Sequence, residues 1–186
     1  MGLLTYFKSL YTIDEELEDF FNSIAVSKKY QKGDVIFEPG AYLRHIYFVE
    51  EGFTRVYYYK NAKDVTHYFF GPQTFSTGIE SVFYQKPSLF GLQATVESRI
   101  VTFPLAPVRT LAQTNITVNH IIQKILLDTL IDFSKRFYNS QFETAQERYN
   151  ALLNDNPQLL LNASLGHIAS YLGVSQQTLS VIRGMK

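Results

Sequence analysis

Residues 165–184, LGHIASYLGVSQQTLSVIRG, show a pattern that is typical of two short helices joined by a tight turn. Small Ala169 stands where a second helix crosses the first, and Gly173 stands four residues later, where the turn requires a left-handed backbone. Ser164 and Ser175 each precede a helical run, at the N-cap position. Aliphatic side chains are available to hold the pair together: Leu165, Ile168, Leu172, Val174, Leu179 and Ile182. The stretch therefore predicts a helix-turn-helix.

The exposed side of the second predicted helix carries side chains that suit double-stranded DNA. Glutamine bonds bidentately to adenine, arginine bonds to guanine, and hydroxyls bond to phosphate or base. No acidic residue follows Asn156, so the local charge is positive although 17 Lys and Arg balance 17 Asp and Glu in the whole chain. The alternative is an ordinary solvated helix. We expect a DNA-reading surface formed by Ser175, Gln176, Gln177, Thr178, Ser180, Arg183 and Lys186.

Residues 26–104 have a different texture, rich in aromatic and β-branched side chains. Gly33, Gly40 and Gly52 recur about every dozen residues, which is typical of short antiparallel strands joined by tight turns. This pattern predicts an antiparallel β-roll. Upstream, Thr12 and Glu15 read as a capping box that opens a helix over residues 12–24. Several aromatic side chains could line an apolar pocket, with cross-strand packing as the alternative: Tyr57, Tyr58, Tyr59, Phe69 and Phe70.

Residues 116–138 predict one long helix with nearly two apolar faces. At 100° steps one face holds Val118, Ile122, Ile125, Leu126, Leu130, Phe133 and Phe137, and the adjacent face holds Ile116, Leu127, Ile131 and Tyr138. One explanation is a central core helix. The other is that one face packs on the β-roll and the second on another copy, which favours a homodimer. A further helix is expected over residues 142–155.

Composition excludes several classes of protein. The chain has no cysteine, so disulfides and thiolate metal sites are excluded. The four histidines, His45, His67, His120 and His167, are scattered rather than clustered as in β-roll enzymes. We expect no catalytic residues, no metal, no cofactor and no enzyme activity. Neither a signal peptide nor an apolar run of about 20 residues is present, so a cytoplasmic protein without a membrane partner is expected.

Three stretches together resemble the Crp/Fnr family of bacterial transcription regulators. KGDVIFEPG…IYFVEEGFTRVYY (32–58) is similar to the family's β-roll signature, ETAQERYNALLNDNP (143–157) to its linker helix and HIASYLGVSQQTLSVIR (167–183) to its DNA-reading motif. The resemblance covers nearly the whole chain. It implies an α+β fold with a cyclic-nucleotide-binding-like β-roll sensor at 1–114, a long dimerisation helix at 115–139 and a helix-turn-helix domain at 140–186. It implies a homodimer on a near-palindromic operator, with RNA polymerase and a small-molecule effector as further partners.

The resemblance also implies an effector pocket, with two departures. Cyclic-nucleotide-binding members have a Gly-Glu pair that opens a short helix and an arginine for the phosphate; here Ile79 separates Gly78 from Glu80, and Leu92 and Gln93 stand at the arginine's place. An unpaired phosphate would be penalised, so we expect no cyclic AMP binding, and Arg99 lies too far along to substitute. The expected pocket comprises Gly78, Glu80, Ser81, Leu92, Gln93 and Thr95.

The recognition helix departs from the family as well. Val181 stands where the family usually has an arginine, so the base preference should differ. The sequence stops at Lys186, which leaves little or no room for a β-wing. An alternative function remains: a ligand-binding or scaffolding β-roll protein whose helix-turn-helix no longer reads DNA.

Overall fold

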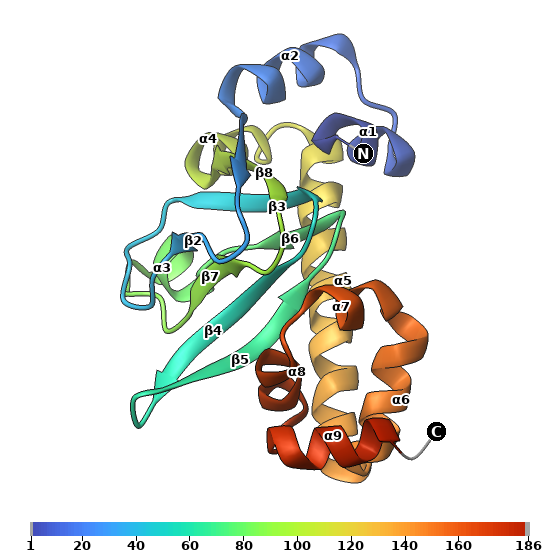
Figure 1. Cartoon of the computed structure of the whole chain (residues 1–186). Coiled ribbons are helices and arrows are strands. Elements are labelled where there is room, and N and C mark those ends of the chain that lie inside the picture. Colours follow the sequence, from blue (N-terminus) through green and yellow to red (C-terminus); the bar gives the residue numbers. More distant parts are fainter. Residues whose placement is uncertain (1, 185–186) are drawn as a thin grey trace.

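The computed structural model describes residues 2–184. A β-roll occupies the centre of the molecule, with α1 and α2 at one end and α9 at the other (Figure 1). The first part of the chain contains α1 (Leu3–Leu10), α2 (Glu15–Ile24), β1 (Val26–Tyr30), β2 (Val35–Phe37), β3 (His45–Glu51), β4 (Thr54–Lys60), β5 (Lys63–Phe70), β6 (Thr74–Ser76), α3 (Ile79–Tyr84), β7 (Gly91–Ala94) and β8 (Ser98–Pro104). The rest contains α4 (Leu105–Leu111), α5 (Ile116–Phe142), α6 (Ala145–Asp155), α7 (Pro157–Asn162), α8 (Leu165–Leu172) and α9 (Gln176–Gly184).

The strands form two antiparallel four-stranded sheets, in the orders β1-β8-β3-β6 and β2-β7-β4-β5. Their inward side chains include Val49, Leu92 and Ile100, each 0% exposed. At Gly52, between β3 and β4, φ is +86°, and a Cβ would lie 2.6 Å from the carbonyl oxygen of Glu97. Only glycine fits such a turn without displacing the next strand. The predicted α+β fold, with its antiparallel β-roll, long helix and terminal helix-turn-helix, is confirmed.

The N-terminal helices differ from the prediction. Helix α2 begins at Glu15 rather than at residue 12, and its N-cap is Asp14, whose side chain accepts a hydrogen bond from the N–H of Leu17 at 2.9 Å. The Thr12–Glu15 capping box is therefore wrong, because the buried side chain of Ile13 sets where the chain turns into the helix. Helix α1, which the sequence did not predict, buries Leu3 and Phe7 in the same core.

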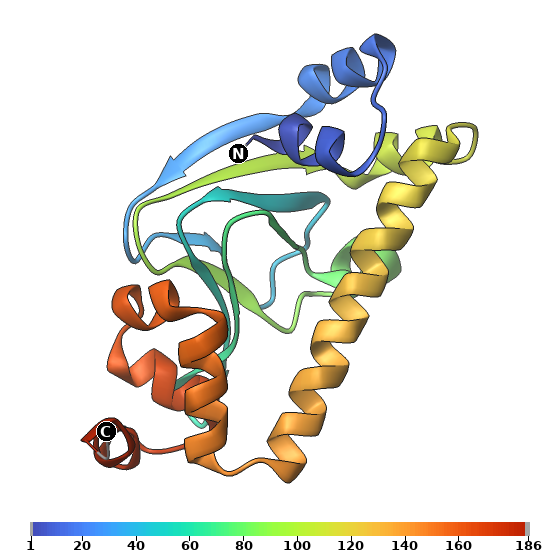
Figure 2. The ribbon, with the colours of Figure 1, turned by 90° about the vertical axis from the view of Figure 1, so that its right-hand side faces the viewer.

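Helix α5 runs along one side of the roll for most of the length of the molecule (Figure 2). The Asn115 side chain caps it by accepting from the N–H of Val118 at 3.1 Å. Only Val118 and Ile121 are fully buried, against the N-terminal helices and the first sheet. Leu130 and Phe137, predicted on the same face as Val118, are instead 64% and 65% exposed. The helix therefore packs through its N-terminal half and turns most of its later apolar side chains outward.

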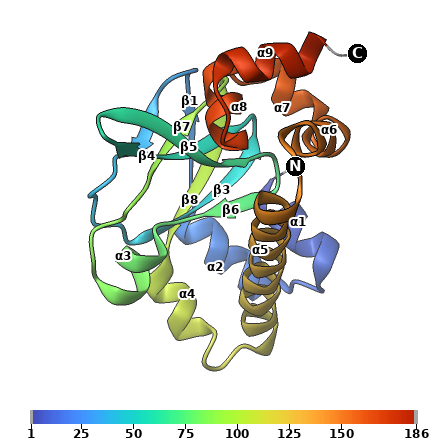
Figure 3. The same ribbon diagram turned by 90° about the horizontal axis from the view of Figure 1, so that it is seen from below.

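The helical C-terminal part packs on the roll through β5. Helix α8 lies between α9 and the strands (Figure 3). The N–H of Thr66 donates to Oγ of Ser170 at 2.7 Å, and Phe69 belongs to the same core cluster as Ile168 and Leu179. An aromatic side chain of the sheet is thus part of the apolar core of the helix-turn-helix.

An ion pair between a buried arginine and an exposed aspartate lies on the same outer side of the second sheet. Arg55 is 2% exposed, and its guanidinium bonds to both carboxylate oxygens of Asp64, to Oγ1 of Thr66 at 3.1 Å and to Oε1 of Gln93 at 2.7 Å. The hydrogen bonds from Arg55 lower the pKa of Asp64. The pair ties β4, β5 and β7 together beneath α8.

Replacing Asp64 with Asn should destabilise the chain at neutral pH by about 1–3 kcal/mol, because the buried guanidinium keeps its desolvation penalty without its charged partner. Since the pKa of Asp64 is lower in the folded state, its contribution is present above the unfolded value of about 3.9 and is lost as the pH falls through the folded value. The unfolding free energies of wild type and Asp64→Asn should therefore converge below about pH 4 in urea titrations. Asp19→Asn, at an exposed position on α2, is the control. A difference that stays constant down to pH 3 would contradict the assignment.

Candidate nucleic-acid interface and effector cavity

The turn between α8 and α9 has the geometry that its sequence predicts. Ser164 caps α8 by accepting from the N–H of His167 at 3.1 Å. Gly173 ends the helix with φ +71° and ψ +30°, and the N–H of Val174 donates back to the carbonyl of Ala169 at 2.9 Å. This is a left-handed C-cap, and it sends the chain directly into the second helix.

The N-terminus of α9 is closed by Ser175. Its Oγ accepts from the N–H of Thr178 at 3.0 Å and lies 2.8 Å from the Thr178 hydroxyl. The buried side chains Leu179 and Ile182 face α8 and α6. The other side of the helix is open: the predicted residues Ser175, Gln176, Gln177, Thr178, Ser180 and Arg183 are all exposed. Lys186, the seventh predicted residue, lies outside the described residues.

The side chains of Gln176 and Gln177 lie in different surroundings, a difference that the sequence pattern did not predict. A Cβ on Gly166 would lie 2.8 Å from Nε2 of Gln176, so the Gln176 side chain rests against the first turn of α8. Gln177, one residue further along α9, is exposed. The signal that could have shown this was a glycine inside a predicted helix, which usually marks a close approach.

The charges around the exposed side of α9 favour the binding of an anion only weakly. Residues 156–184 contain no Asp or Glu, and Arg183 is the arginine in the last turn of α9. His167 adds no charge at neutral pH, because burial and then Arg55 lower its pKa. Val181 is 57% exposed on the same helix and offers no hydrogen bond. The surface is therefore mostly neutral and polar, with a single described cation on α9.

The predicted effector residues near α3 are mostly packed against the roll. Gly78 is the N-cap residue of α3, and a Cβ there would lie 2.8 Å from Cδ1 of Leu43. Ser81 is buried, and its Oγ accepts from the N–H of Leu43. Glu80, between them, lines a cavity of about 200 Å³.

The predicted effector residues on and after β7 are also held by the protein. Leu92 is 0% exposed in the roll core. Gln93 accepts from Arg55 and donates to the carbonyl of Gly33 at 2.8 Å, while Oγ1 of Thr95 donates to the carbonyl of Phe53 at 3.0 Å. None of the three lines the cavity, so of the six predicted residues only Glu80 does.

The cavity lies between the interior of the roll, α3 and the inner face of α5. Val56 and Phe70 contribute to its roll side, and Ile122, Ile125 and Phe133 to its α5 side. Of the predicted aromatic row, only Phe70 reaches it: Phe69 lies in the helix-turn-helix core, and Tyr59 is 60% exposed. The sequence missed the α5 side because no local pattern pairs residues so far apart.

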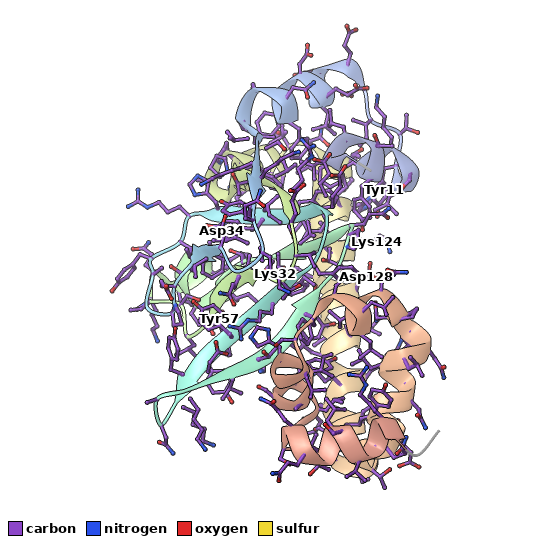
Figure 4. The ribbon with its side chains drawn as sticks, in the orientation of Figure 1. Tyr11, Lys32, Asp34, Tyr57, Lys124 and Asp128 are labelled. Atoms are coloured by element: carbon purple, nitrogen blue, oxygen red, sulfur yellow. The ribbon has the colours of Figure 1, made fainter. Side chains whose placement is uncertain are left out.

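Tyr57, from the same row, is a buried structural group rather than a cavity residue. Its hydroxyl donates to Oε2 of Glu38 at 2.6 Å, and the residue lies on β4 (Figure 4). Burial and then the bond to Glu38 raise its pKa. On the flank of α5 near Tyr6 of α1, Lys124 and Asp128 form an ion pair at 2.9 Å (Figure 4).

Two further features concern metal binding and membrane insertion. Within residues 2–184, no three His, Asp or Glu side chains gather as a metal site would require. No helix of that part is both long and apolar enough to span a bilayer.

Comparison with known proteins finds others that share this architecture. Residues 27–115 match the cyclic nucleotide-binding domain family. The chain resembles FixK2 from Bradyrhizobium japonicum (19% identity, TM-score 0.73, covering 87% of this chain and 84% of that one). It also resembles the c-di-GMP-responsive global regulator CLP from Xanthomonas campestris (16%, 0.71, 92% and 91%) and a Crp/Fnr-family transcriptional regulator from Thermus thermophilus (19%, 0.66, 86% and 84%). No curated protein matches the sequence.

These findings define a β-roll protein in which residues 27–115 match the cyclic nucleotide-binding domain family and a helix-turn-helix lies at the C-terminal end. The predicted resemblance to Crp/Fnr transcription regulators is confirmed, and the chain shares their fold over nearly its whole length.

Replacing Gly173 with Ala should destabilise the chain by about 1–2 kcal/mol, because a Cβ opposes the left-handed backbone. No atom lies within 4 Å of the added Cβ, so the cost is conformational and not steric with neighbours. Gly173→Asn should cost less, since asparagine tolerates this conformation better. Urea unfolding of both variants measures the difference. Equal stability of the two would show that the turn has another constraint.

Proposed function

We propose that the chain is a DNA-binding transcription regulator of the Crp/Fnr type. In this proposal residues 1–114 are the sensor, 115–139 the dimerisation helix and 140–186 the DNA-binding domain. The observation that carries it is the exposed, serine-capped α9, which presents glutamine, hydroxyl and arginine side chains with no acidic residue nearby. Because a regulator of this type binds chromosomal DNA, we expect it in the cytoplasm.

The N-terminus of α9 suits the major groove, where a recognition helix contacts bases with its first residues. Gln177 is the better placed base reader, because Gln176 rests on Gly166. The remaining polar residues of the surface, Thr178, Ser180 and Arg183, with Lys186 from the sequence, position the helix on the phosphates. Val181 cannot donate to guanine, so the preferred bases should differ from those of members with arginine there.

Selection of bound fragments from random duplex DNA should enrich a near-palindrome with half-sites about 34–36 Å apart.

Gln177→Ala should lower discrimination at one base pair by about 1–3 kcal/mol. Arg183→Gln should weaken binding to every sequence, and the salt dependence should be shallow because few counterions are released. Gln158→Ala, at an exposed position on α7, is the matched control. Absence of a palindrome, with affinity for any duplex weaker than about 10⁻⁴ M at physiological salt, would favour the scaffolding alternative.

A homodimer through α5 is part of the proposal. The outer side of this helix exposes a row of large apolar side chains that a solvated helix does not need: Ile116, Leu126, Leu127, Leu130, Ile131, Phe137, Tyr138 and Phe142. The row repeats at helical spacing, so a second copy of α5 can cover it by two-fold symmetry. The dimer would present two α9 helices to the two half-sites.

Leu130→Glu should split the dimer and leave the protomer folded, because Leu130 is 64% exposed and its burial would come from the partner. Phe133→Glu should also destabilise the protomer, since the Phe133 ring lies 5.6 Å from that of Tyr68. Sedimentation and circular dichroism separate the two effects. Lys135→Glu, a charge reversal at an exposed polar position of α5 outside the apolar row, should leave the dimer intact. A wild type that sediments as a monomer at micromolar concentration contradicts the proposal.

The roll is proposed to be a sensor that does not bind cyclic AMP. Leu92 and Gln93 stand where a phosphate-pairing arginine is expected, and the nearby Arg55 is turned to the outside of the sheet and paired with Asp64. A phosphate buried without a cation would lose its hydration uncompensated.

A further inference from the structure

The cavity between the roll and α5 has a largely apolar lining. Of its lining residues, most are Phe, Ile, Leu and Val, and Glu80 is the single formal charge. Among residues 2–184, no lysine or arginine lines it. The charge pattern is therefore opposite to what an anionic ligand requires.

Its size is sufficient for a small molecule. The volume is about 200 Å³, whereas an engineered cavity of about 150 Å³ lined by apolar side chains holds benzene. A molecule of one substituted ring would fit this space.

One end of the cavity has a neutral polar group. The imidazole of His67 stacks on the ring of Phe90, with centroids 4.6 Å apart, and lies 6.4 Å from the ring of Phe133. Burial and then Arg136 lower the pKa of His67. A neutral imidazole has one donor and one acceptor nitrogen and adds no charge to the site.

We propose that this cavity binds an uncharged, largely apolar small molecule of about the size of a substituted benzene. The inference rests on the proposed sensor function of the roll and names the class of its effector. A peptide segment is a poorer occupant, because its backbone N–H and C=O groups would meet phenyl and aliphatic side chains without partners. An anion is poorer still, because Glu80 would repel it.

The experiment is calorimetric titration of the purified full chain with toluene, and with benzoate as an anion of the same ring. Toluene should bind saturably, about one molecule per chain, and benzoate at least about tenfold more weakly, because its carboxylate is desolvated without a cation. Cyclic AMP should give no binding. The proposal is overturned if toluene fails to saturate, if benzoate binds as tightly as toluene, or if cyclic AMP binds.

Two variants test whether toluene and benzoate bind in this cavity. Glu80→Gln should tighten benzoate binding several-fold and leave toluene unchanged, while Glu16→Gln, at an exposed position on α2, should change neither. Thr129→Phe, which fills the α5 side, should abolish toluene binding. If Thr129→Phe fails to fold, the Glu80→Gln titration decides alone, and an unchanged benzoate affinity there overturns the proposal. DNA selection is performed without ligand, so loss of DNA binding and loss of toluene binding are separate failures.

Discussion

The contact between the inner face of α5 and the open side of the β-roll is the constraint on which the other features depend. Val118 and Ile121 anchor the helix in the N-terminal core. Beyond them the helix touches the roll with fewer buried side chains, which leaves the apolar cavity on one side and the exposed apolar row on the other. One helix therefore separates the proposed ligand site from the proposed dimer surface.

A second constraint is that the core of the helix-turn-helix is completed by a side chain of the sheet. Phe69 from β5 enters its apolar cluster, and Thr66 of the same strand bonds to Ser170. Small helical units bury too little surface to be stable alone, so docking on the sheet is part of how this one is held. The ion pair between buried Arg55 and Asp64 beneath it supports the strand that supplies both contacts.

The parts of the fold that the sequence predicts well are those set by local chemistry. Gly173, Ser164 and Ser175 identify the helix-turn-helix because caps and left-handed turns restrict residue type at single positions. Where two local signals compete, prediction fails: Thr12 and Asp14 can both cap, and the burial of Ile13 decides. The cavity could not be predicted, because Glu80 and Ile125 meet only through tertiary packing.

The same aromatic side chains belong to the cavity and to the support of the helix-turn-helix. Phe133 and Tyr68 both line the cavity, with ring centroids 5.6 Å apart. The ring of Tyr68 in turn lies 6.4 Å from that of Tyr171 of α8, and the guanidinium of Arg136 lies over both, 5.3 Å and 4.5 Å from their centroids. Because close-packed rings respond to added volume by shifting together, a molecule at this end of the cavity would act on side chains that already contact α8. Packed aromatic rings therefore connect the proposed ligand site to α8, which packs against the proposed DNA-reading helix α9.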